Sequence, residues 1–308
     1  MADKNILVLN GGATRGLIQV ACLAEVEART GKRIHELFDL IVATSVGAIT
    51  GSMLAAGVAA KDIEAGMLSD RGLSYMFEPR TPWNPMNWFR FKYRRSRVMA
   101  LVEQSVPNSM KMRELLVPVV LASWNINTQA PIFFKSYNPK YADLPVNTVI
   151  PLCFAAPIYF GFLSPSWLRN TVSDAGLGGE NSPVDQAYQE IIRLGWFNES
   201  TTETVSLTVI GSGHCIKTTP FEETRNWGFV KQTVASLGVS LSEAITEYQI
   251  NCMNTITSAF PARLKFNYVD TELDVKDMKF GIADSDTLGR FQTLGHEMGQ
   301  KFRIDVLA

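Results

Sequence analysis

Ser45 lies at the centre of the run Ala-Thr-Ser-Val-Gly at positions 43–47, between a buried apolar run and a helical pattern. A serine in a sharp turn from strand to helix is raised above the edge of the sheet, where its Oγ can attack a substrate carbonyl. The first N–H groups of the helix favour negative charge at the same place. Gly47 provides the small residue that such a turn needs, whereas Ala43 replaces the first glycine of the usual G-x-S-x-G pattern. The alternative is a serine that only caps an ordinary helix.

A second candidate is Asp174, in the stretch RNTVSDAGLGG at positions 169–179. Residues 170–173 are expected to form a short strand, and the aspartate follows at its end. Because α/β proteins assemble their sites at the carboxyl ends of parallel strands, this carboxylate could accept the serine proton if it lies about 3 Å from Oγ. A turn aspartate bonded to its own backbone is the alternative.

The third candidate is a glycine-rich turn, NGGATRG at positions 10–16, which follows the first apolar run. Successive backbone N–H groups in such a turn can converge on an oxyanion and lower the barrier to acyl transfer. A nucleotide-phosphate loop would need G-x-x-x-x-G-K-[ST] or G-x-G-x-x-G, and neither spacing is present. The remaining alternative is a tight turn that uses glycine only for its backbone angles.

These three segments must be positioned by regular elements, and the pattern of strand, turn and helix is that of βαβ units in an α/β fold. We expect a single domain over 1–308, with the chemistry-bearing motifs within 10–176 and a largely helical C-terminal part over 225–308. Strands are predicted at 5–9, 38–43, 117–123, 132–135, 170–173 and 205–210, and helices at 15–29, 46–56, 184–194, 229–260 and 284–301.

Composition excludes several other classes of protein. The formal net charge of −1 gives the whole molecule no attraction for nucleic acid. Four scattered cysteines form no C-x-x-C pair, which argues against a disulfide framework and against a structural zinc site. We expect a cytoplasmic protein without a signal peptide or a membrane span, because the uncharged stretches 40–60 and 144–168 are rich in small residues or in proline.

Positions 77–97 are rich in aromatic and basic residues, which alternate from 89 to 94, and this composition suits the interface of a membrane with anionic lipids. We expect peripheral membrane contact through this segment, and the residues that carry the hypothesis are Trp83, Trp88, Phe89, Arg94 and Arg95. An ordinary solvated surface over a partly buried aromatic patch is the alternative.

The three motifs together resemble those of the patatin-like phospholipase family, in that family's order: NGGATRG, then ATSVG, then DAG at 174–176. CFAAPIYF at 153–160 and DAGLGGENSP at 174–183 are similar to further stretches of the family. The resemblance covers nearly the whole chain. It implies a three-layer α/β/α fold with a mostly parallel central sheet, and hydrolysis of fatty acyl esters of membrane lipids in the manner of a phospholipase A.

The resemblance also implies roles for individual residues. Ser45 would be the nucleophile and Asp174 its base, with no metal and no organic cofactor. The backbone N–H groups of Gly11, Gly12 and Ala13 would form the oxyanion hole.

Supporting roles would fall to Arg15, which steadies that loop, and to Gly47 and Gly176. The chain departs from the family pattern where Ala13, Ala43 and Ala175 stand in place of glycine.

Two other functions remain open at this point. An esterase or acyltransferase of the α/β-hydrolase type would complete a Ser-His-Asp triad with His214 or His296. Alternatively, the three alanines could mark a catalytically impaired member of the family that binds lipid without cleaving it.

Overall fold

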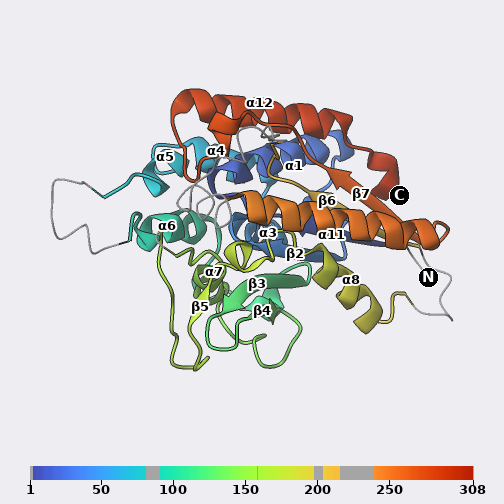
Figure 1. The fold of residues 1–308 in the computed structure, drawn as a ribbon, viewed down its shortest axis with the longest axis horizontal. Coiled ribbons are helices and arrows are strands. Elements are labelled where there is room, and N and C mark those ends of the chain that lie inside the picture. The colour runs from blue at the N-terminus through green and yellow to red at the C-terminus, as the bar shows by residue number, and fades with distance from the viewer. Residues whose placement is uncertain (1–2, 81–90, 158, 198–203, 216–238, 308) are drawn as a thin grey trace, which may run out of the picture.

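The computed structural model describes residues 3–80, 91–157, 159–197, 204–215 and 239–307, and it places a central sheet between two layers of helices (Figure 1). Among these residues the sheet has seven strands, in the order β4-β3-β2-β1-β6-β7, with the short β5 paired to β3. The strands are β1 (Lys4–Leu9), β2 (Leu40–Thr44), β3 (Val119–Asn125), β4 (Ala130–Lys135), β5 (Val172–Ser173), β6 (Val205–Ile210) and β7 (Leu264–Val269). Strands β1, β2, β3, β6 and β7 run parallel to one another, whereas β4 and β5 run antiparallel to β3.

Strand β1 shows why the sheet needs helices on both faces. Side chains alternate along a strand, so Leu7 and Leu9 point into one apolar core while Ile6 and Val8 point into the other. All four side chains are fully buried. A strand buried on both faces is the usual state of a parallel sheet covered by crossover helices.

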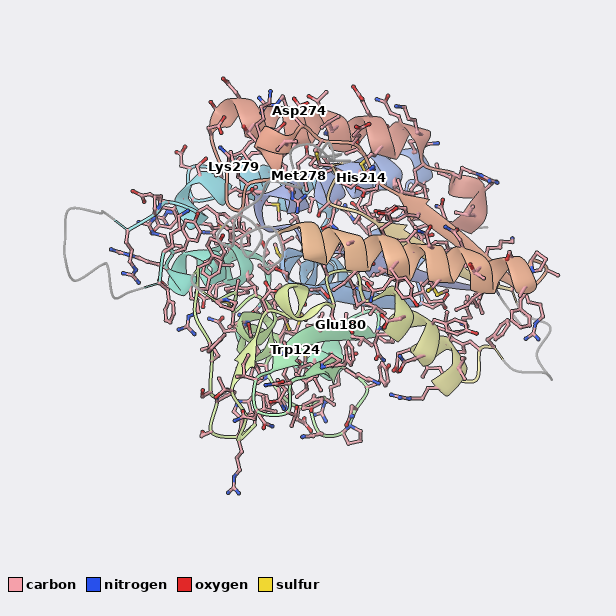
Figure 2. All side chains as sticks on the ribbon, in the orientation of Figure 1. Trp124, Glu180, His214, Asp274, Met278 and Lys279 are labelled. Atoms are coloured by element: carbon pink, nitrogen blue, oxygen red, sulfur yellow. The ribbon has the colours of Figure 1, made fainter. Side chains whose placement is uncertain are left out.

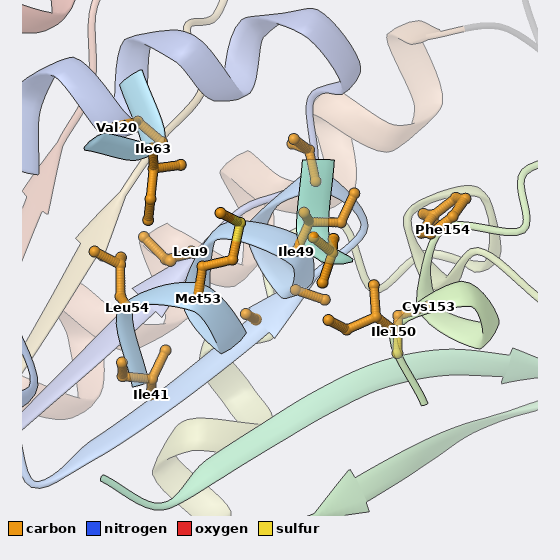
Figure 3. Packing of buried hydrophobic residues seen from close by; sticks show 14 of the residues in the cluster. Leu9, Val20, Ile41, Ile49, Met53, Leu54, Ile63, Ile150, Cys153 and Phe154 are labelled. Atoms are coloured by element: carbon orange, nitrogen blue, oxygen red, sulfur yellow. The ribbon is translucent and has the colours of Figure 1, made fainter. Parts of the chain in front are cut away.

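The larger core lies between the sheet and the helices α1 (Gly16–Thr30), α2 (Ile34–Leu37), α3 (Val46–Ala55), α4 (Ala60–Leu68), α5 (Leu73–Met76), α6 (Arg95–Ser105), α7 (Val146–Cys153) and α12 (Ser285–Lys301). The opposite face is covered by α8 (Val184–Arg193) and α11 (Val239–Ala259). Figure 3 shows part of the larger core, with Ile49, Met53 and Leu54 of α3 packed among side chains of the neighbouring elements. Among the described residues, no helix combines the length and the apolar character needed to cross a bilayer.

The predicted α/β fold with a mostly parallel sheet is confirmed, but the expectation of a largely helical C-terminal part missed a strand. β7, with the sequence LKFNYV, pairs in parallel with β6 at the edge of the sheet. Lys265 and Asn267 interrupt its apolar residues, and an edge strand tolerates such residues because one of its sides has no neighbouring strand. Of the helix predicted at 229–260, the structure shows α11 from residue 239, and positions 229–238 lie outside the described residues.

Helices α1 and α12 approach closely because α12 carries glycine where they meet. A Cβ built on Gly295 would lie 2.4 Å from the carbonyl oxygen of Ile18, and one on Gly299 would lie 2.6 Å from that of Cys22. Both obstacles are backbone atoms, which cannot turn aside as a side chain can. In contrast, a Cβ on Gly289, in the same helix, would meet nothing within 4 Å.

Gly295→Ala should therefore destabilise the protein by about 1–3 kcal/mol, the usual cost of overpacking a core. Gly289→Ala is the matched control, and it should stabilise the protein by about 0.5–1 kcal/mol because alanine is the better helix former. Urea unfolding followed by circular dichroism would measure both changes. A stabilisation by Gly295→Ala similar to that by Gly289→Ala would contradict the close contact of α1 with α12.

Candidate active site

Ser45 occupies the turn between β2 and α3 in a strained conformation, with φ 55° and ψ −123°. A non-glycine residue with positive φ costs on the order of 1–3 kcal/mol and is common at functional sites. Although Ser45 stands at the N-cap position of α3, its side chain makes no capping hydrogen bond. The interpretation of Ser45 as an ordinary helix cap is therefore wrong.

Gly47 lets this turn close against the end of β1. A Cβ at position 47 would lie 2.6 Å from the carbonyl oxygen of Leu9 and 2.9 Å from that of Asn10. Real Cβ atoms do not approach backbone this closely, so only glycine fits. The physical basis for a supporting role of Gly47 is therefore the absence of a side chain where the turn meets the backbone of β1.

The side chain of Ser45 instead contacts Asp174. Ser45 Oγ donates a hydrogen bond to Asp174 Oδ2 at 2.6 Å, and the other carboxylate oxygen, Oδ1, accepts the N–H of Gly176 at 2.9 Å. Both side chains are nearly enclosed, since Ser45 is 8% exposed and Asp174 is 4% exposed. The hydroxyl is therefore placed to give its proton to a carboxylate whose orientation is fixed from its other side.

Burial raises the pKa of Asp174 from 3.8 to about 6, while the hydrogen bonds from Ser45 and Gly176 oppose the shift. Desolvation disfavours a charged carboxylate, and hydrogen bonds to the charged form favour it. The carboxylate is thus more basic than an ordinary aspartate, yet it is still mostly ionised at neutral pH. A base in this range suits proton abstraction near neutrality.

Two segments hold Asp174 beside the serine. On its N-terminal side, the hydroxyl of Ser123 in β3 donates to the carbonyl oxygen of Ser173 at 2.9 Å, and Asp174 N–H donates to the carbonyl oxygen of Ala155 at 3.2 Å. On its C-terminal side, Thr44 Oγ1 donates to the carbonyl oxygen of Glu180 at 2.8 Å. Since Thr44 immediately precedes Ser45, the serine and aspartate turns are joined directly.

The glycine-rich loop runs past Ser45 from the end of β1. Gly11 N–H donates to the carbonyl oxygen of Asn181 at 2.9 Å, so this amide is already engaged, and the expectation that Gly11 supplies an oxyanion donor does not fit the structure. Within the described part of the chain, no hydrogen bond is found for the N–H groups of Gly12 and Ala13. The amides that remain for an oxyanion are those of Gly12 and Ala13.

Arg15 ties this loop to the segment that follows β6 and to Met278. Its Nη1 donates to the carbonyl oxygen of Gly213 at 3.0 Å and lies 3.1 Å from Met278 Sδ. Figure 2 labels Met278 and His214, the neighbour of Gly213, close together between α12 and α11. Arg15 thus steadies the loop from outside the site, without a contact to Ser45 among the hydrogen bonds described.

The three alanines that depart from the glycine pattern fit in different ways. Ala43 and Ala175 are fully buried, so their methyl groups fill packed space. Ala13 takes a positive φ of 52° and lines a pocket next to Ser45, so its methyl group adds backbone strain in the loop.

That pocket is apolar apart from Ser45 and Asp174. The other side chains that line it are those of Ala13, Val46, Ile49, Met76, Phe77, Val98, Phe154, Phe160 and Phe280. Its free volume is about 20 Å³, the space of a single water molecule, because aromatic rings fill it. Phe77 and Phe280, for example, pack edge to face with ring centroids 6.0 Å apart.

The histidines proposed for a Ser-His-Asp triad are paired elsewhere. His214 Nδ1 lies 3.1 Å from Asp270 Oδ2, and His296 Nε2 lies 2.9 Å from Glu64 Oε1. Among the hydrogen bonds of the described residues, Ser45 Oγ bonds to Asp174 and to neither histidine. In the same part of the chain, no group of three or more histidine, cysteine, aspartate or glutamate residues could hold a metal ion.

Two further residues belong to this arrangement. Asn181 lies against the loop, since its Oδ1 would be 2.5 Å from a Cβ on Gly11, and Ser212 donates to the carbonyl oxygen of Gly11 at 2.7 Å. Asn181 falls within the DAGLGGENSP stretch, and Ser212 falls in a Gly-Ser-Gly turn at the carboxyl end of β6. In the sequence, only these positions pointed to Asn181 and Ser212, and neither position predicts a contact with the glycine-rich loop.

Comparison with models of known protein families gives a match that includes the residues of this site. The family model described as Patatin-like phospholipase matches residues 7–188, which is more than half of the chain and includes Ser45 and Asp174. The chain belongs to this family. The patatin-like match thus confirms the resemblance inferred from the three motifs.

Relatives of this patatin-like chain include two proteins named cGAMP-activated phospholipase. The one from Escherichia coli (strain TW11681) is 29% identical over 191 residues, which cover 57% of this chain and 52% of that protein. The one from Vibrio cholerae is 30% identical over 212 residues, which cover 61% of this chain and 58% of that protein. The matched part of the chain thus spans only a little more than half the length of these relatives.

Solved structures similar to the patatin-like chain include VipD from Legionella pneumophila, with a TM-score of 0.47 and 13% identity over 100% of this chain and 67% of that one. The type III effector protein ExoU has a TM-score of 0.47 and 10% identity, over 98% of this chain and 52% of that one.

The raised pKa of Asp174 predicts a pH-dependent effect of Asp174→Asn on stability. Because the folded pKa lies above the unfolded one, the cost of the buried charge is present in full above about pH 6 and disappears as pH falls towards about 4. The rise of the Asp174 pKa from 3.8 to about 6 corresponds to about 3 kcal/mol. Asp174→Asn should therefore raise the free energy of unfolding by up to about 3 kcal/mol at pH 8, and by little at pH 4.

Urea unfolding at a series of pH values would measure this difference. Ser45→Ala is the control, because it leaves the carboxylate buried and removes a hydrogen bond that stabilises its charge. If the difference between Asp174→Asn and the wild type were the same at pH 4 and pH 8, the shifted pKa would be ruled out.

Proposed function

We propose that this chain is a lipid acyl hydrolase that cleaves fatty acyl esters of membrane lipids through a dyad of Ser45 and Asp174. The observation that carries the proposal is the 2.6 Å hydrogen bond from Ser45 Oγ to Asp174 Oδ2, made by a strained serine at the N-terminus of α3. Membership of the patatin-like phospholipase family supports lipid as the substrate class.

The proposed reaction has two acyl-transfer steps. Asp174 takes the proton of Ser45 as Oγ attacks the ester carbonyl, and the N–H groups of Gly12 and Ala13 stabilise the negative oxygen. The protonated Asp174 then gives its proton to the departing alcohol, which leaves an acyl-enzyme. Water enters, Asp174 accepts its proton, and the second tetrahedral species collapses to release the fatty acid and restore the serine hydroxyl.

The apolar pocket beside Ser45 is suited to the acyl chain. Its aromatic and aliphatic lining would bury the methylene groups, while Ala13 and Ser45 lie at the reacting end. Since the pocket has only about 20 Å³ of free volume, binding requires rings such as those of Phe77 and Phe280 to move apart.

Wild-type protein incubated with mixed phospholipid vesicles should release free fatty acid and lysolipid, measured by mass spectrometry. Ser45→Ala and Asp174→Asn should each lose at least about 10³-fold in rate, since both remove a group that takes part in bond making. The wild-type rate should rise with pH through about 6 and then level off, because the base must be ionised.

The controls for this assay separate an inactive site from a missing activator. Each sample should be run with and without cGAMP, because two relatives are named for activation by that nucleotide. A fluorophosphonate that labels Ser45 in the wild type but not in Ser45→Ala would exclude a catalytically impaired lipid binder. Hydrolysis that survives Ser45→Ala would overturn the proposal, and its loss in a folded His214→Ala variant would favour a triad.

We also propose that the segment before α6 contacts the lipid surface. Arg94 is exposed and Arg95 half-buried at the start of α6, and the neighbouring Phe91 ring is 46% exposed. Tyr93, from the same segment, is buried against Phe77, whose ring also lines the apolar pocket. Trp83, Trp88 and Phe89, which the sequence assigns to this surface, lie outside the described residues. The segment thus leads from exposed cations to the pocket beside Ser45.

Arg94→Glu combined with Arg95→Glu should weaken binding to vesicles that contain anionic lipid by at least about 10-fold, since each cation near such a surface contributes about 1 kcal/mol. Vesicle sedimentation at physiological ionic strength would measure it. The matched control is Lys32→Glu with Lys61→Glu, which changes the net charge equally at exposed positions on other elements. Equal loss in both double variants would show a general effect of charge instead of a docking surface.

A further inference from the structure

The peptide that joins Gly11 to Gly12 lies between two serines from opposite sides of β1. In the sheet, β1 has β2 on one side and β6 on the other. Ser45 follows β2, and Ser212 follows β6. Because the strands are parallel, both serines emerge at the same edge of the sheet and flank the loop that leaves β1.

Ser212 is in direct contact with this peptide. Its side chain is buried, with the residue 4% exposed, and its Oγ donates to the carbonyl oxygen of Gly11 at 2.7 Å. A Cβ on Gly12 would lie 2.3 Å from Ser212 Oγ and 2.5 Å from Ser212 Cβ. The φ of Gly12 is 172°, an extended value open to any residue, so glycine is needed here to leave room for Ser212.

The residue that follows Ser212 is anchored by two hydrogen bonds. The N–H of Gly213 donates to Asp270 Oδ1 at 2.7 Å, and Arg15 Nη1 donates to the carbonyl oxygen of Gly213 at 3.0 Å. The backbone carbonyl oxygen of Asn181 fixes the preceding peptide by accepting the N–H of Gly11. The orientation of the Gly11–Gly12 peptide therefore depends on a hydroxyl whose own position is set by neighbouring elements.

In a trans peptide, the C=O and N–H groups point in opposite directions in one plane. A hydroxyl that holds the carbonyl of Gly11 toward β6 therefore directs the N–H of Gly12 toward β2. Ser45 lies on that side, since a Cβ on Gly11 would be 3.2 Å from Ser45 Cβ. We propose that Ser212 is a positioning residue, which aims the Gly12 N–H at the oxyanion formed on the substrate of Ser45; this role rests on the proposed hydrolase function.

The hydroxyl matters because water could compete for the same carbonyl. A cavity of about 600 Å³ adjoins the loop on the side of Ser212, and Asn10, Arg15 and Ser212 itself are among the polar residues in its wall. Without the hydroxyl, the carbonyl of Gly11 would face this space, where water in any orientation could satisfy it. The Gly11–Gly12 peptide would then lose its preferred orientation, and the Gly12 N–H would no longer be directed at the oxyanion.

Ser212→Ala and Ser212→Thr test this role as a pair, with lipid hydrolysis by the wild type as the reference. Removal of a direct oxyanion donor costs about 10²–10³-fold in kcat, so misorientation of one should cost about 10–100-fold. Ser212→Ala should show this loss in kcat with KM changed less than about 3-fold. The reason is that an interaction made only in the transition state affects kcat and leaves KM nearly unchanged. Ser212→Thr keeps the hydroxyl and should recover most of the rate.

A trifluoromethyl ketone forms a tetrahedral adduct with a serine and carries an oxyanion, so its inhibition constant should rise in Ser212→Ala by the same factor as kcat falls. The inflection of the pH–rate profile near 6 should stay in place, since the contacts of Asp174 are untouched. A loss of rate that appears in KM alone, or no loss at all, would overturn the proposal.

A crystal structure of Ser212→Ala decides the question even if the wild type hydrolyses nothing. A rotated or disordered Gly11–Gly12 peptide would support the positioning role. The same peptide orientation as in the wild type would overturn it, whatever the activity. An inert wild type would count against the hydrolase function alone, so the two failures remain distinguishable.

Discussion

The contact between the first turn of α3 and the end of β1 is the constraint on which the site depends. Gly47 rests on the carbonyl oxygens of Leu9 and Asn10, and no side chain fits between them. This contact brings the strained Ser45 turn against the loop that leaves β1, so the proposed nucleophile and the amides of Gly12 and Ala13 come from loops that follow neighbouring strands. The remaining parts, including the Asp174 turn and the segment after β6, are arranged around these two loops.

Asp174 shows how the fold balances a buried charge. Enclosure raises its pKa to about 6, and two hydrogen bonds, from Ser45 and Gly176, limit the rise. Neither donor carries a positive charge, so the carboxylate stays basic enough to take a proton. A salt bridge at this position would lower the pKa and weaken the base. The fold thus carries the cost of a buried charge, and in the proposed reaction that charge would act as the base.

Much of this arrangement could be predicted from sequence because it depends on topology. Parallel strands share a carboxyl edge, so the motifs that follow β1 and β2 meet there. Asp174 follows β5, which runs antiparallel to β3, so the rule for parallel strands expected from the sequence does not account for its place. Ser45 could be named from its turn between a strand and a helix, whereas Asp174 was named from the DAG motif at 174–176 and from the resemblance to the family. The engagement of the Gly11 amide could not, because the direction of a peptide group depends on atoms far away in the chain, here Asn181 and Ser212. Strand β7 was missed because an edge strand does not need the apolar pattern of a buried one.

The rings that fill the apolar pocket have a consequence for where the proposed reaction takes place. Phe77, Phe154, Phe160 and Phe280 occupy the space that an acyl chain would need, so a chain can enter only by displacing apolar side chains from one another. A single lipid dissolved in water offers no other apolar surface to receive them. At the surface of a bilayer the displaced rings can rest among lipid tails, so opening the pocket exposes less apolar area to water. In the proposed reaction, turnover would then follow the area of lipid surface available and would depend little on the number of lipid molecules in solution.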